Sequence, residues 1–330
     1  MNRPSVVIVS PALAAANNGN WQTARRWRQL LVDRAHVRIT QHWPDAHAAG
    51  DNIMLALHAR RSADSIAAWA RSRGERSLGV VLTGTDLYRD IETDSQARRS
   101  LELATRLVVL QELGVNALPV QLRPKTRVIY QSTTQRCTLT KTTRELRAVM
   151  VGHLREVKSP QTLMEAARLL ADRPDIRIAH IGGAEEAPWE KRARDTGQIC
   201  PSYRWLGALP HARARQSIQR SHVLIHSSAM EGGAHVIMEA VRSGTPVLAS
   251  RVPGNVGMLG ADYEGYFEHG NAQQLCNMLL QCRLGQQSKG DDPAPALLER
   301  LRAQCVLRAP LFSPESEQVA LRQLLVELQD

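Results

Sequence analysis

The chain has few aromatic residues and few lysines, and both shortages narrow the range of functions. Phe, Trp and Tyr make up 4% of the 330 residues, with only two Phe. Aromatic rings form the stacking surfaces of single-strand nucleic-acid binders, so this scarcity argues against such a protein. The net charge is +10, yet only five of the 42 basic residues are lysines, and the arginines are spread along the chain. A basic nucleic-acid-binding protein is therefore a minor alternative.

The sequence also lacks the patterns of a disulfide-bonded, zinc-binding or membrane-spanning protein. No apolar run approaches the roughly 18 residues that a membrane span requires. The cysteines form no CxxC pair and no paired Cys/His spacing, which predicts reduced thiols in a cytoplasmic protein without a metal site. They are Cys137, Cys200, Cys276, Cys282 and Cys305. Residues 6–9 and 12–16 imitate a signal peptide, but Pro11 interrupts the run and favours a buried strand followed by a loop.

Short apolar runs alternate with helical patterns along the whole chain. This alternation predicts an α/β fold with parallel sheets that are covered by helices on both faces. The length suits two domains of about 150 residues each. We expect Rossmann-like domains over residues 1–135 and 136–310 with their sheets facing a central cleft, and a helix over 311–330 that packs back on the first domain. The boundary is expected within the Ser-, Thr-, Lys- and Arg-rich stretch Gln131–Glu145.

The expected elements follow from these runs. Strands are expected at Val6–Ser10, Val37–Thr40, Ile53–Leu57, Leu78–Leu82, Leu107–Leu110, Arg127–Tyr130, Ala148–Gly152, Ile176–Ile181, Tyr203–Leu206, His222–His226 and Pro246–Ser250. Helices are expected at Trp21–Asp33, Ser62–Ser72, Ser159–Ala171, Ala296–Cys305 and Pro314–Leu328, with another beginning near His235 and loose segments at Asn17–Asn20 and Gly285–Pro295. No Gly-x-Gly-x-x-Gly follows the first strand, which argues against a nicotinamide-dependent dehydrogenase.

The most informative stretch is His226–Ser250, which reads as strand, loop, helix and strand. Glu231 lies in the loop and Glu239 about one turn inside the helix, where the helix dipole favours ionised carboxylates. An ionised carboxylate accepts two hydrogen bonds, which suits the neighbouring hydroxyls of a sugar or ribose. Gly232–Gly233 would let a ligand approach the backbone. The alternative is that both carboxylates are ordinary loop and helix-start charges.

Two further stretches of the second half end strands. Gly152–Lys158 closes the first strand and brings cationic side chains to that edge of the sheet. Pro253–Met258 follows a later strand, and its glycines predict a loop whose N–H groups can turn toward a phosphate. Ligands of parallel sheets bind beyond the carboxyl ends of the strands, so these stretches are expected to share one site.

The ordered set Gly-x-Leu-x3-Lys, Leu206-Gly207, Glu-x7-Glu, Gly-Thr-Pro-Val and a Gly-rich loop resembles family 4 of the GT-B glycosyltransferases. The resemblance covers essentially the whole second half and implies a metal-independent enzyme, with retention at the anomeric carbon, that binds a nucleotide-sugar. It implies that Glu239 holds the ribose, that Glu231, Gly232, Gly233 and Ala234 hold the transferred sugar, and that Lys158, Gly254, Asn255, Val256 and Gly257 hold the diphosphate. Gly207 is also expected to contact the nucleotide-sugar. The family usually has Arg where His153 stands. Either Arg155 would supply the missing positive charge, or His153 would contribute a pH-dependent hydrogen-bond donor.

The first half resembles the family more faintly. Asn18-Gly19-Asn20 enters a helix, with Gly19 expected at the donor, and Thr83–Asp86 follows a strand. Many relatives carry His where Thr83 stands. A hydroxyl acceptor benefits from such a base, whereas an acceptor that is already anionic needs cationic residues to position it.

A cluster of polar residues offers such an acceptor site. Arg60 and Arg61 follow His58 at the end of a strand and the start of a helix, a favourable place for an anion. With Thr83 and Thr85 they make up the expected acceptor-binding set. The alternative is that Arg60 and Arg61 are solvated helix-start charges.

Four stretches together resemble the bacterial selenosugar synthases of selenoneine biosynthesis: Ser10–Trp21, Leu57–Ser62, Leu82–Tyr88 and Val151–Lys158. That resemblance implies a UDP-sugar donor, with UDP-N-acetylglucosamine expected, and selenophosphate as the acceptor in forming a carbon–selenium bond. The alternatives are a UDP-sugar-dependent O- or N-glycosyltransferase and a UDP-sugar epimerase. No cofactor, nucleic-acid partner or membrane partner is expected.

Overall fold

The computed structural model describes residues 3–13, 19–74, 76–287 and 296–329. Two predicted features, the loop at Asn17–Asn18 and most of the segment Gly285–Pro295, lie outside the described residues. The chain divides into two compact units: residues 1–132, 231–235 and 311–330 form the first, and residues 133–230 and 236–310 form the second. In the described ranges no helix is long and apolar enough to cross a membrane.

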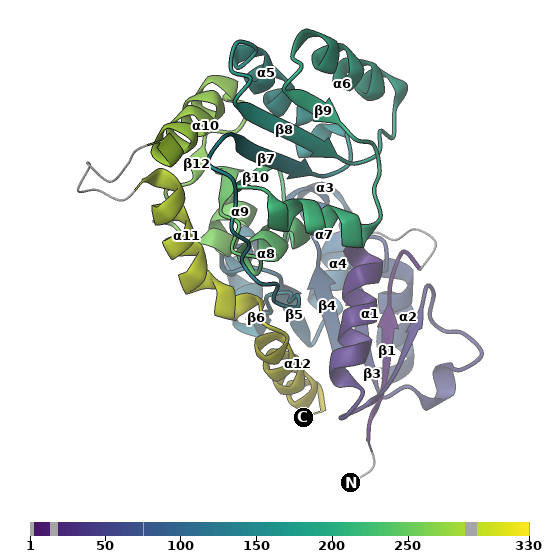
Figure 1. Ribbon diagram of the computed structural model, residues 1–330. Coiled ribbons are helices and arrows are strands. Elements are labelled where there is room, and N and C mark those ends of the chain that lie inside the picture. Colours follow the sequence, from purple (N-terminus) through teal and green to yellow (C-terminus); the bar gives the residue numbers. More distant parts are fainter. Residues whose placement is uncertain (1–2, 14–18, 75, 288–295, 330) are drawn as a thin grey trace. The chain divides into compact units, whose positions relative to one another are not determined.

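The first unit is built on a six-stranded parallel sheet with the strand order β2-β1-β3-β4-β5-β6 (Figure 1). Its central strands are continuous apolar runs, as expected where helices cover both faces of a parallel sheet. The strand order reverses between β1 and β3, so the crevice beyond their carboxyl ends is the natural ligand site of this sheet. The strands are β1 Ser5–Val9, β2 His36–Thr40, β3 Ile53–Leu57, β4 Leu78–Leu82, β5 Arg106–Val109 and β6 Thr126–Val128.

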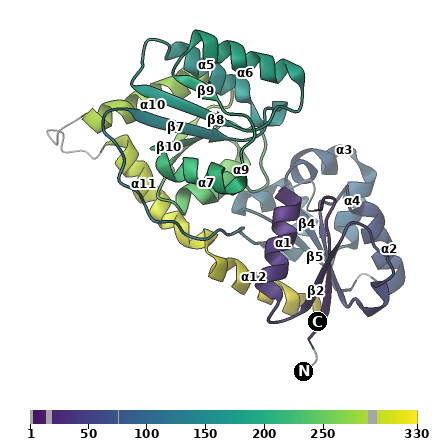
Figure 2. The same cartoon turned by 45° about the vertical axis from the view of Figure 1, so that its right-hand side comes forward.

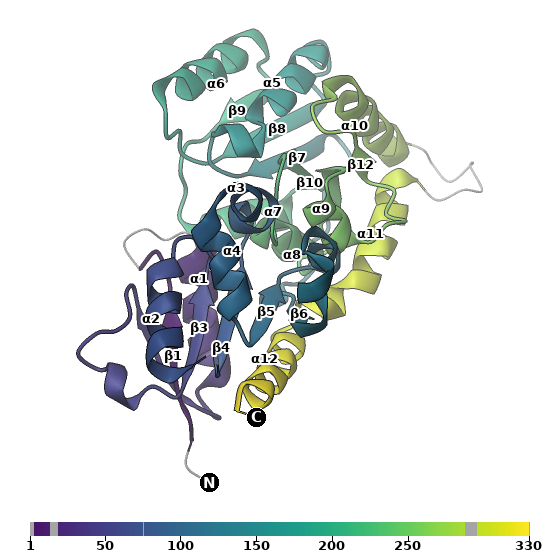
Figure 3. The same cartoon turned by 180° about the vertical axis from the view of Figure 1, so that it is seen from behind.

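Each face of this first sheet has its own core. On one face Met54 and Val80 pack with Trp69 of α2 and Leu101 of α4, and these helices lie on the near side of the sheet in Figure 3. On the other face, strand residues pack with Trp27 of α1 and with several leucines of α12 (Figure 2). The helices are α1 Gly19–Leu31, α2 Ala63–Arg73, α3 Ile91–Thr93, α4 Ser95–Leu103 and α12 Pro314–Gln329.

The second unit contains another six-stranded parallel sheet, with the order β12-β11-β10-β7-β8-β9. The order reverses between β7 and β10, so the loops after these two strands border the ligand crevice of this sheet. Register supports the arrangement, since Val149 of β7 lies beside Leu224 on one side and Ala179 on the other. The strands are β7 Leu146–Val151, β8 Ile176–Ile181, β9 Tyr203–Trp205, β10 Val223–His226, β11 Val247–Ser250 and β12 Tyr266–Phe267.

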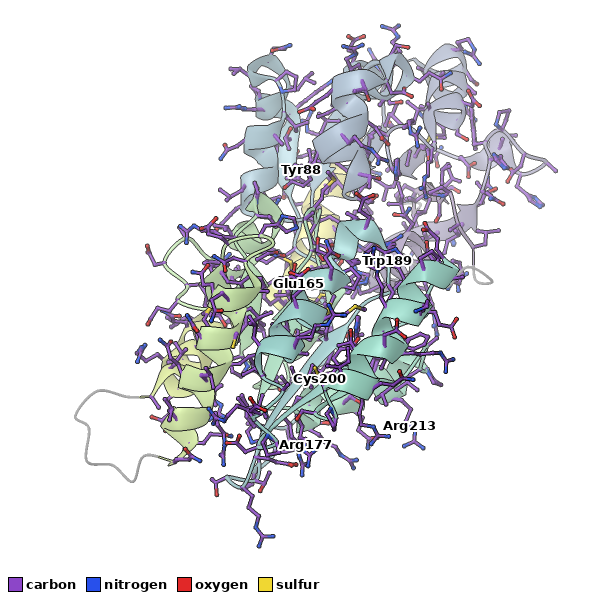
Figure 4. All side chains as sticks on the ribbon, turned by 90° about the horizontal axis from the view of Figure 1, so that it is seen from above. Tyr88, Glu165, Arg177, Trp189, Cys200 and Arg213 are labelled. Carbon is purple, nitrogen blue, oxygen red and sulfur yellow. The ribbon has the colours of Figure 1, made fainter. Side chains whose placement is uncertain are left out.

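Helices cover both faces of the second sheet as well. Figure 1 shows α5, α6 and α10 on one side of the strands and α7 and α8 on the other. Cys200, labelled in Figure 4, follows the last residue of α6, and its thiol is buried. The helices are α5 Pro160–Leu169, α6 Ala187–Ile199, α7 His211–Arg220, α8 His235–Val241, α9 Pro253–Leu259, α10 Ala272–Gln287 and α11 Leu297–Arg308.

The predicted α/β fold with two parallel sheets is confirmed, and every expected strand is present within about two residues at each end. β12 was not predicted, because two residues carry no readable periodicity. The structure differs more sharply at residues 253–259, which form the helix α9 instead of the predicted loop. Pro253 explains the difference, since proline at the first position of a helix has a suitable φ and no N–H to leave unpaired.

Candidate functional site

Glu239 is a buried carboxylate of α8 in the second unit. Its side chain is 6% exposed, and its Oε1 accepts a hydrogen bond from His211 Nε2 at 2.5 Å. Arg215 Nε lies 3.8 Å from the same oxygen. Both partners come from α7, where a spacing of four residues puts them on one face of the helix. Both contacts involve Oε1, and they fix the orientation of the carboxylate.

Arg215 is itself anchored to the segment that leads into the second unit. Its two terminal nitrogens donate to Thr134, at 3.2 Å to the hydroxyl and 2.8 Å to the carbonyl oxygen. Burial lowers the pKa of Arg215, and the charge of Glu239 opposes that shift. The guanidinium is therefore fixed by Thr134 and largely shielded from water, and its charge lies beside Glu239.

The turn after β7 positions Lys158. Lys158 ends a short helical turn, Glu156–Lys158, and its N–H donates to Arg155 O at 2.9 Å. The aliphatic part of Lys158 packs beside Gly152, where a Cβ atom would lie at an ordinary van der Waals distance of 3.9 Å from both Cγ and Cδ. Ser227, directly after β10, donates its hydroxyl proton to Lys158 O at 3.0 Å. The two loops that border the crevice are therefore joined to each other.

Ser159 completes this turn in an unusual backbone conformation. Its φ of 46° lies in the left-handed region, which L-residues adopt only when their surroundings hold them there. Ser159 Oγ lies 2.8 Å from His269 Nε2, and Ser227 Oγ also contacts Ser159 O at 3.1 Å. These contacts hold the junction between Lys158 and helix α5.

His153 and Arg155 lie on the same turn but have different neighbours. The His153 ring lies over Gly183, where a Cβ atom would be 3.5 Å from Nδ1. The Arg155 guanidinium is 3.9 Å from Glu185 on the loop after β8, so part of its charge is offset. Both side chains are exposed. Both residues therefore lie in the turn that leads from β7 to Lys158, at the carboxyl edge of the second sheet.

Glycines let three loops of this edge approach one another closely. A side chain at Gly182 would collide with the carbonyl group of Gly152, and Gly182 has a φ of 153°. The Gly182 N–H donates to Gly207 O at 2.8 Å. Gly182 therefore contacts both Gly152 and Gly207, the latter of which is predicted to contact the nucleotide-sugar.

The residues predicted to bind the diphosphate through a loop are instead part of α9. Gly254, Asn255, Val256 and Gly257 all lie in this helix, which is seven residues long. The amides of Asn255 and Val256 both donate to Val252 O at 3.0 Å, and Asn255 Nδ2 donates to Ser250 O at 2.9 Å. The prediction of a phosphate-binding loop is therefore wrong in its conformation, because these amides complete a helical turn.

Glu231, Gly232, Gly233 and Ala234 belong to the first unit, although the sequence places them in the second domain. The physical reason is close backbone packing. A side chain at Gly232 would lie 2.5 Å from the Thr83 carbonyl group, and one at Gly233 would lie 2.7 Å from Leu110 Cβ. Glu231 is buried, and its charge contributes to raising the pKa of Tyr88 to about 12, after burial as the main cause. Tyr88, labelled in Figure 4, also accepts a hydrogen bond from Gln111 Nε2 at 2.7 Å.

The predicted acceptor residues come together beyond β3 and β4 of the first sheet. His58 is 3% exposed and has a φ of 72°, and its Nε2 lies 3.2 Å from Thr85 Oγ1. Burial lowers the pKa of His58, while Asp86 and Asp90 oppose the shift. The Arg61 N–H points to His58 Nδ1 at 3.4 Å, so Nδ1 acts as the acceptor and Nε2 carries the proton of the neutral ring.

Asp86 organises this cluster and was not predicted as a site residue. Its buried carboxylate accepts three backbone hydrogen bonds, from Thr83, Gly84 and Ala59, at 2.9, 2.8 and 3.0 Å. The residue lies in the quoted Thr-Gly-Thr-Asp stretch, and its position two residues after a glycine is typical of a carboxylate that caps a turn.

The cations of this cluster are not equivalent. Arg60 Nε lies 3.0 Å from Asp90, which offsets its charge. Arg61 is exposed and forms no salt bridge with any residue that the structure describes. Gly19, predicted at the donor, is the exposed first residue of α1, and its carbonyl accepts from Thr23 Oγ1 at 2.8 Å. Within the described ranges, His, Cys, Asp and Glu form no group of three or more that could hold a metal ion.

The sequence is similar to known glycosyltransferases, and the family match lies in its second half. Residues 131–282 match the family described as glycosyl transferases group 1. A protein of Xenopus tropicalis named glycosyltransferase 1 domain-containing protein 1 is 23% identical over 75% of this chain and 79% of its own length. A D-inositol 3-phosphate glycosyltransferase of Corynebacterium urealyticum is 32% identical over 45% of this chain and 36% of its own length.

Solved structures match over nearly the whole chain. The Anabaena protein HepE, crystallised with UDP-glucose, superposes with a TM-score of 0.74 at 14% identity and covers 98% of this chain and 99% of its own. Sucrose-phosphate synthase from Thermosynechococcus elongatus gives a TM-score of 0.74 at 17% identity over 99% of both chains. Residues 131–282 therefore match the group 1 glycosyl transferase family, and the chain as a whole has the GT-B fold.

Proposed function

We propose that the protein is a family 4 glycosyltransferase that transfers a sugar, N-acetylglucosamine in our expectation, from a UDP-sugar to selenophosphate. The observation that carries the UDP-sugar part is the buried Glu239 carboxylate, held by His211 and Arg215 at the carboxyl edge of the group 1 domain. UDP-glucose in HepE, and UDP with GlcNAc in the pneumococcal protein GtfA, support the choice of donor. The selenophosphate part depends on the resemblance to the selenosugar synthases.

Glu239 is suited to recognise the ribose of UDP. His211 and Arg215 both contact Oε1, so the carboxylate is fixed in orientation before a ligand arrives. Two neighbouring ribose hydroxyls can then donate to a carboxylate whose side chain loses little conformational entropy on binding.

Lys158 is suited to stabilise the departing UDP. Negative charge grows on the β-phosphate as the bond from the anomeric carbon to the phosphate oxygen breaks, and a positioned ammonium lowers that barrier more than it strengthens ground-state binding. His153 lies on the same turn, whereas Arg155 already faces Glu185. We therefore expect His153, and not Arg155, to assist Lys158.

The cluster around His58 is suited to an anionic acceptor. The neutral His58 ring donates toward Thr85, and Arg61 is a cation without a described salt bridge. In the proposed step a selenium lone pair of selenophosphate forms the bond to the anomeric carbon. The carbon–oxygen bond to UDP breaks at the same time, and UDP leaves with that electron pair. No oxidant or proton transfer is required for this step.

An acceptor comparison tests the proposed function. Purified protein is incubated with UDP-N-acetylglucosamine and selenophosphate, D-inositol 3-phosphate or no acceptor, and the products are identified by mass spectrometry. We expect a selenium-containing glycoside and UDP release that depends on selenophosphate. Product from D-inositol 3-phosphate alone would assign a hydroxyl acceptor instead, the function that the name of the Corynebacterium urealyticum relative suggests. Release of UDP at the same rate without any acceptor would overturn both assignments.

The two carboxylates are expected to have separable roles. Glu239→Gln should weaken UDP binding by about 10- to 100-fold, because hydrogen bonds to a charged group are worth about 1.5–3 kcal/mol. Glu231→Gln should slow sugar transfer and leave UDP affinity within about threefold. Calorimetric titration with UDP and steady-state kinetics separate the two effects.

Glu190→Gln is the matched control for these variants. Glu190 pairs with Arg194 on the exposed surface of α6, so its loss should change neither measurement. Equal UDP affinity in Glu239→Gln and Glu190→Gln would exclude the ribose-binding role of Glu239.

A further inference from the structure

A cavity of about 390 Å³ lies at the amino edge of the second sheet. Three segments that line it or border it directly precede parallel strands: residues 138–143 lead into β7, His222 into β10 and Thr245 into β11. The remaining walls come from the end of α10 and the first turns of α11. Because parallel strands place all their carboxyl ends at the other edge, this cavity is separate from the turn that carries Lys158 and from the helix α8 that carries Glu239.

Two cations face this cavity. Lys141 is half-buried, and its ammonium donates to Thr245 Oγ1 at 3.2 Å. Arg302 lines the same cavity from α11. Neither forms a salt bridge with a described residue, and the carboxylate in the lining is the exposed Glu299. Burial, and to a smaller extent the charge of Arg302, lower the pKa of Lys141 to about 8.

The lining also contains an imidazole ring, threonine hydroxyls and the apolar side chains of Leu139, Ala296 and Leu298. His222 Nδ1 accepts from the Arg147 N–H at 2.8 Å, and His222 Nε2 donates to Thr142 O at 2.8 Å, so the ring is a neutral wall. Burial lowers the pKa of His222, and the nearby charges of Lys141, Arg302 and Arg147 lower it further. Threonine hydroxyls on the segment 138–143 add hydrogen-bond donors and acceptors to the lining.

We propose that this cavity binds the phosphoryl group of a small phosphorylated metabolite between Lys141 and Arg302. Two cations and several hydroxyls in one lining match a tetrahedral dianion, which accepts hydrogen bonds from both kinds of group. The volume falls in the range of small-molecule pockets and leaves room for a polar body beside the phosphoryl group. The amino edge of the second sheet would then hold a second ligand site, independent of the nucleotide-sugar site.

The proposal explains why two unpaired cations persist at a half-buried position. The folded-state pKa of Lys141 is below its ordinary value of 10.5, so its protonated form costs stability at pH 7, and that cost disappears as the pH rises from about 8 to 10.5. A bound anion removes the cost at neutral pH by stabilising the ammonium. A cation kept solely for folding would be paired or replaced by an apolar residue.

Binding of two probes tests the proposal. Inorganic phosphate and glucose 6-phosphate are titrated into the full-length protein at pH 7, with UDP present in excess to occupy the nucleotide site. We expect saturable binding of one phosphoryl group per chain. Tighter binding of glucose 6-phosphate would identify a phosphate ester as the occupant, and equal affinity would identify free phosphate. No saturable binding of either probe would overturn the proposal.

Matched variants locate the site. Lys141→Met and Arg302→Gln should each weaken binding by about tenfold or more. Arg300→Gln removes the same charge from α11, but Arg300 pairs with Glu264, so its affinity should stay within about twofold of wild type. Lys141→Met should also raise the Tm in phosphate-free buffer and abolish the rise in Tm that phosphate causes in wild type. Equal weakening in Arg300→Gln would mean that net charge alone attracts the probe, and the site assignment would fail.

Discussion

Lys158→Ala is expected to lower kcat by about 100- to 1,000-fold without unfolding the protein. Removing one preorganised donor that stabilises developing charge costs about this much in other active sites. The backbone of Lys158 is held for such a role, because Ser227 donates a hydrogen bond to its carbonyl group. Its aliphatic part packs beside Gly152. An ammonium that merely bound substrate would change KM and leave kcat nearly unchanged.

The measurement is single-turnover transfer from the UDP-sugar, with UDP affinity determined in parallel. Lys191→Ala is the matched control, because Lys191 pairs with Asp195 on the exposed face of α6 and should be dispensable. A Lys158→Ala enzyme with full kcat and a raised KM would assign Lys158 to ground-state binding alone. An enzyme unaffected in both constants would remove this turn from the site altogether.

His269→Ala tests whether His269 positions Lys158 through its contact with Ser159. Ser159 adopts a left-handed backbone conformation beside His269, directly after Lys158. We expect a kcat that falls less than in Lys158→Ala, about tenfold, since the ammonium is retained but less well placed. Recovery of kcat in His269→Gln, which can still hydrogen-bond Ser159, would support a positioning role, and failure of Gln to restore it would contradict that role.

The sheets could be predicted from sequence because buried parallel strands are nearly continuous apolar runs. Ile53–Leu57, Leu78–Leu82 and Ile176–Ile181 were predicted at the residues where the structure has them. The helix α9 could not be recognised as easily, because Gly254 and Gly257 are poor helix formers and favour a loop. Its position is decided by tertiary contacts such as Asn255 Nδ2 to Ser250 O.

Site residues that belong to a sequence motif could be predicted, whereas those brought to the site by tertiary packing could not. Glu239 and Lys158 belong to spacings that can be read along the chain, whereas His211 and Arg215 belong to none of the motifs. Their four-residue spacing before a buried acid was the available signal. The grouping of Glu231 with the first unit depends on glycine at residue 232, where the backbone packs against Thr83. No local pattern encodes that contact.

Glu317→Leu is expected to destabilise the first unit by about 3 kcal/mol, at the lower end for breaking a buried ion pair. Glu317 is 1% exposed on α12, and its carboxylate accepts from Arg26 at 2.8 and 3.1 Å and from Trp27 Nε1 at 2.7 Å. Ser132 donates to it through both its N–H, at 2.8 Å, and its hydroxyl, at 2.5 Å. Leucine would leave the buried donors of Trp27 and Ser132 without this acceptor and would remove the ion pair of the partly buried Arg26.

This single carboxylate joins three distant parts of the chain, α1, the end of the first domain and α12, so its loss should loosen all three together. Thermal and urea unfolding of Glu317→Leu, Glu317→Gln and Glu315→Leu measures the effect. Glu317→Gln should be intermediate because the amide oxygen still accepts, and Glu315→Leu on the exposed face of α12 should cost less than about 1 kcal/mol. A fall in Tm for Glu317→Leu of about 6–12 °C corresponds to the expected loss. If Glu317→Leu and Glu315→Leu unfold alike, the network does not hold α12 in place, and the leucines that α12 packs against the sheet suffice.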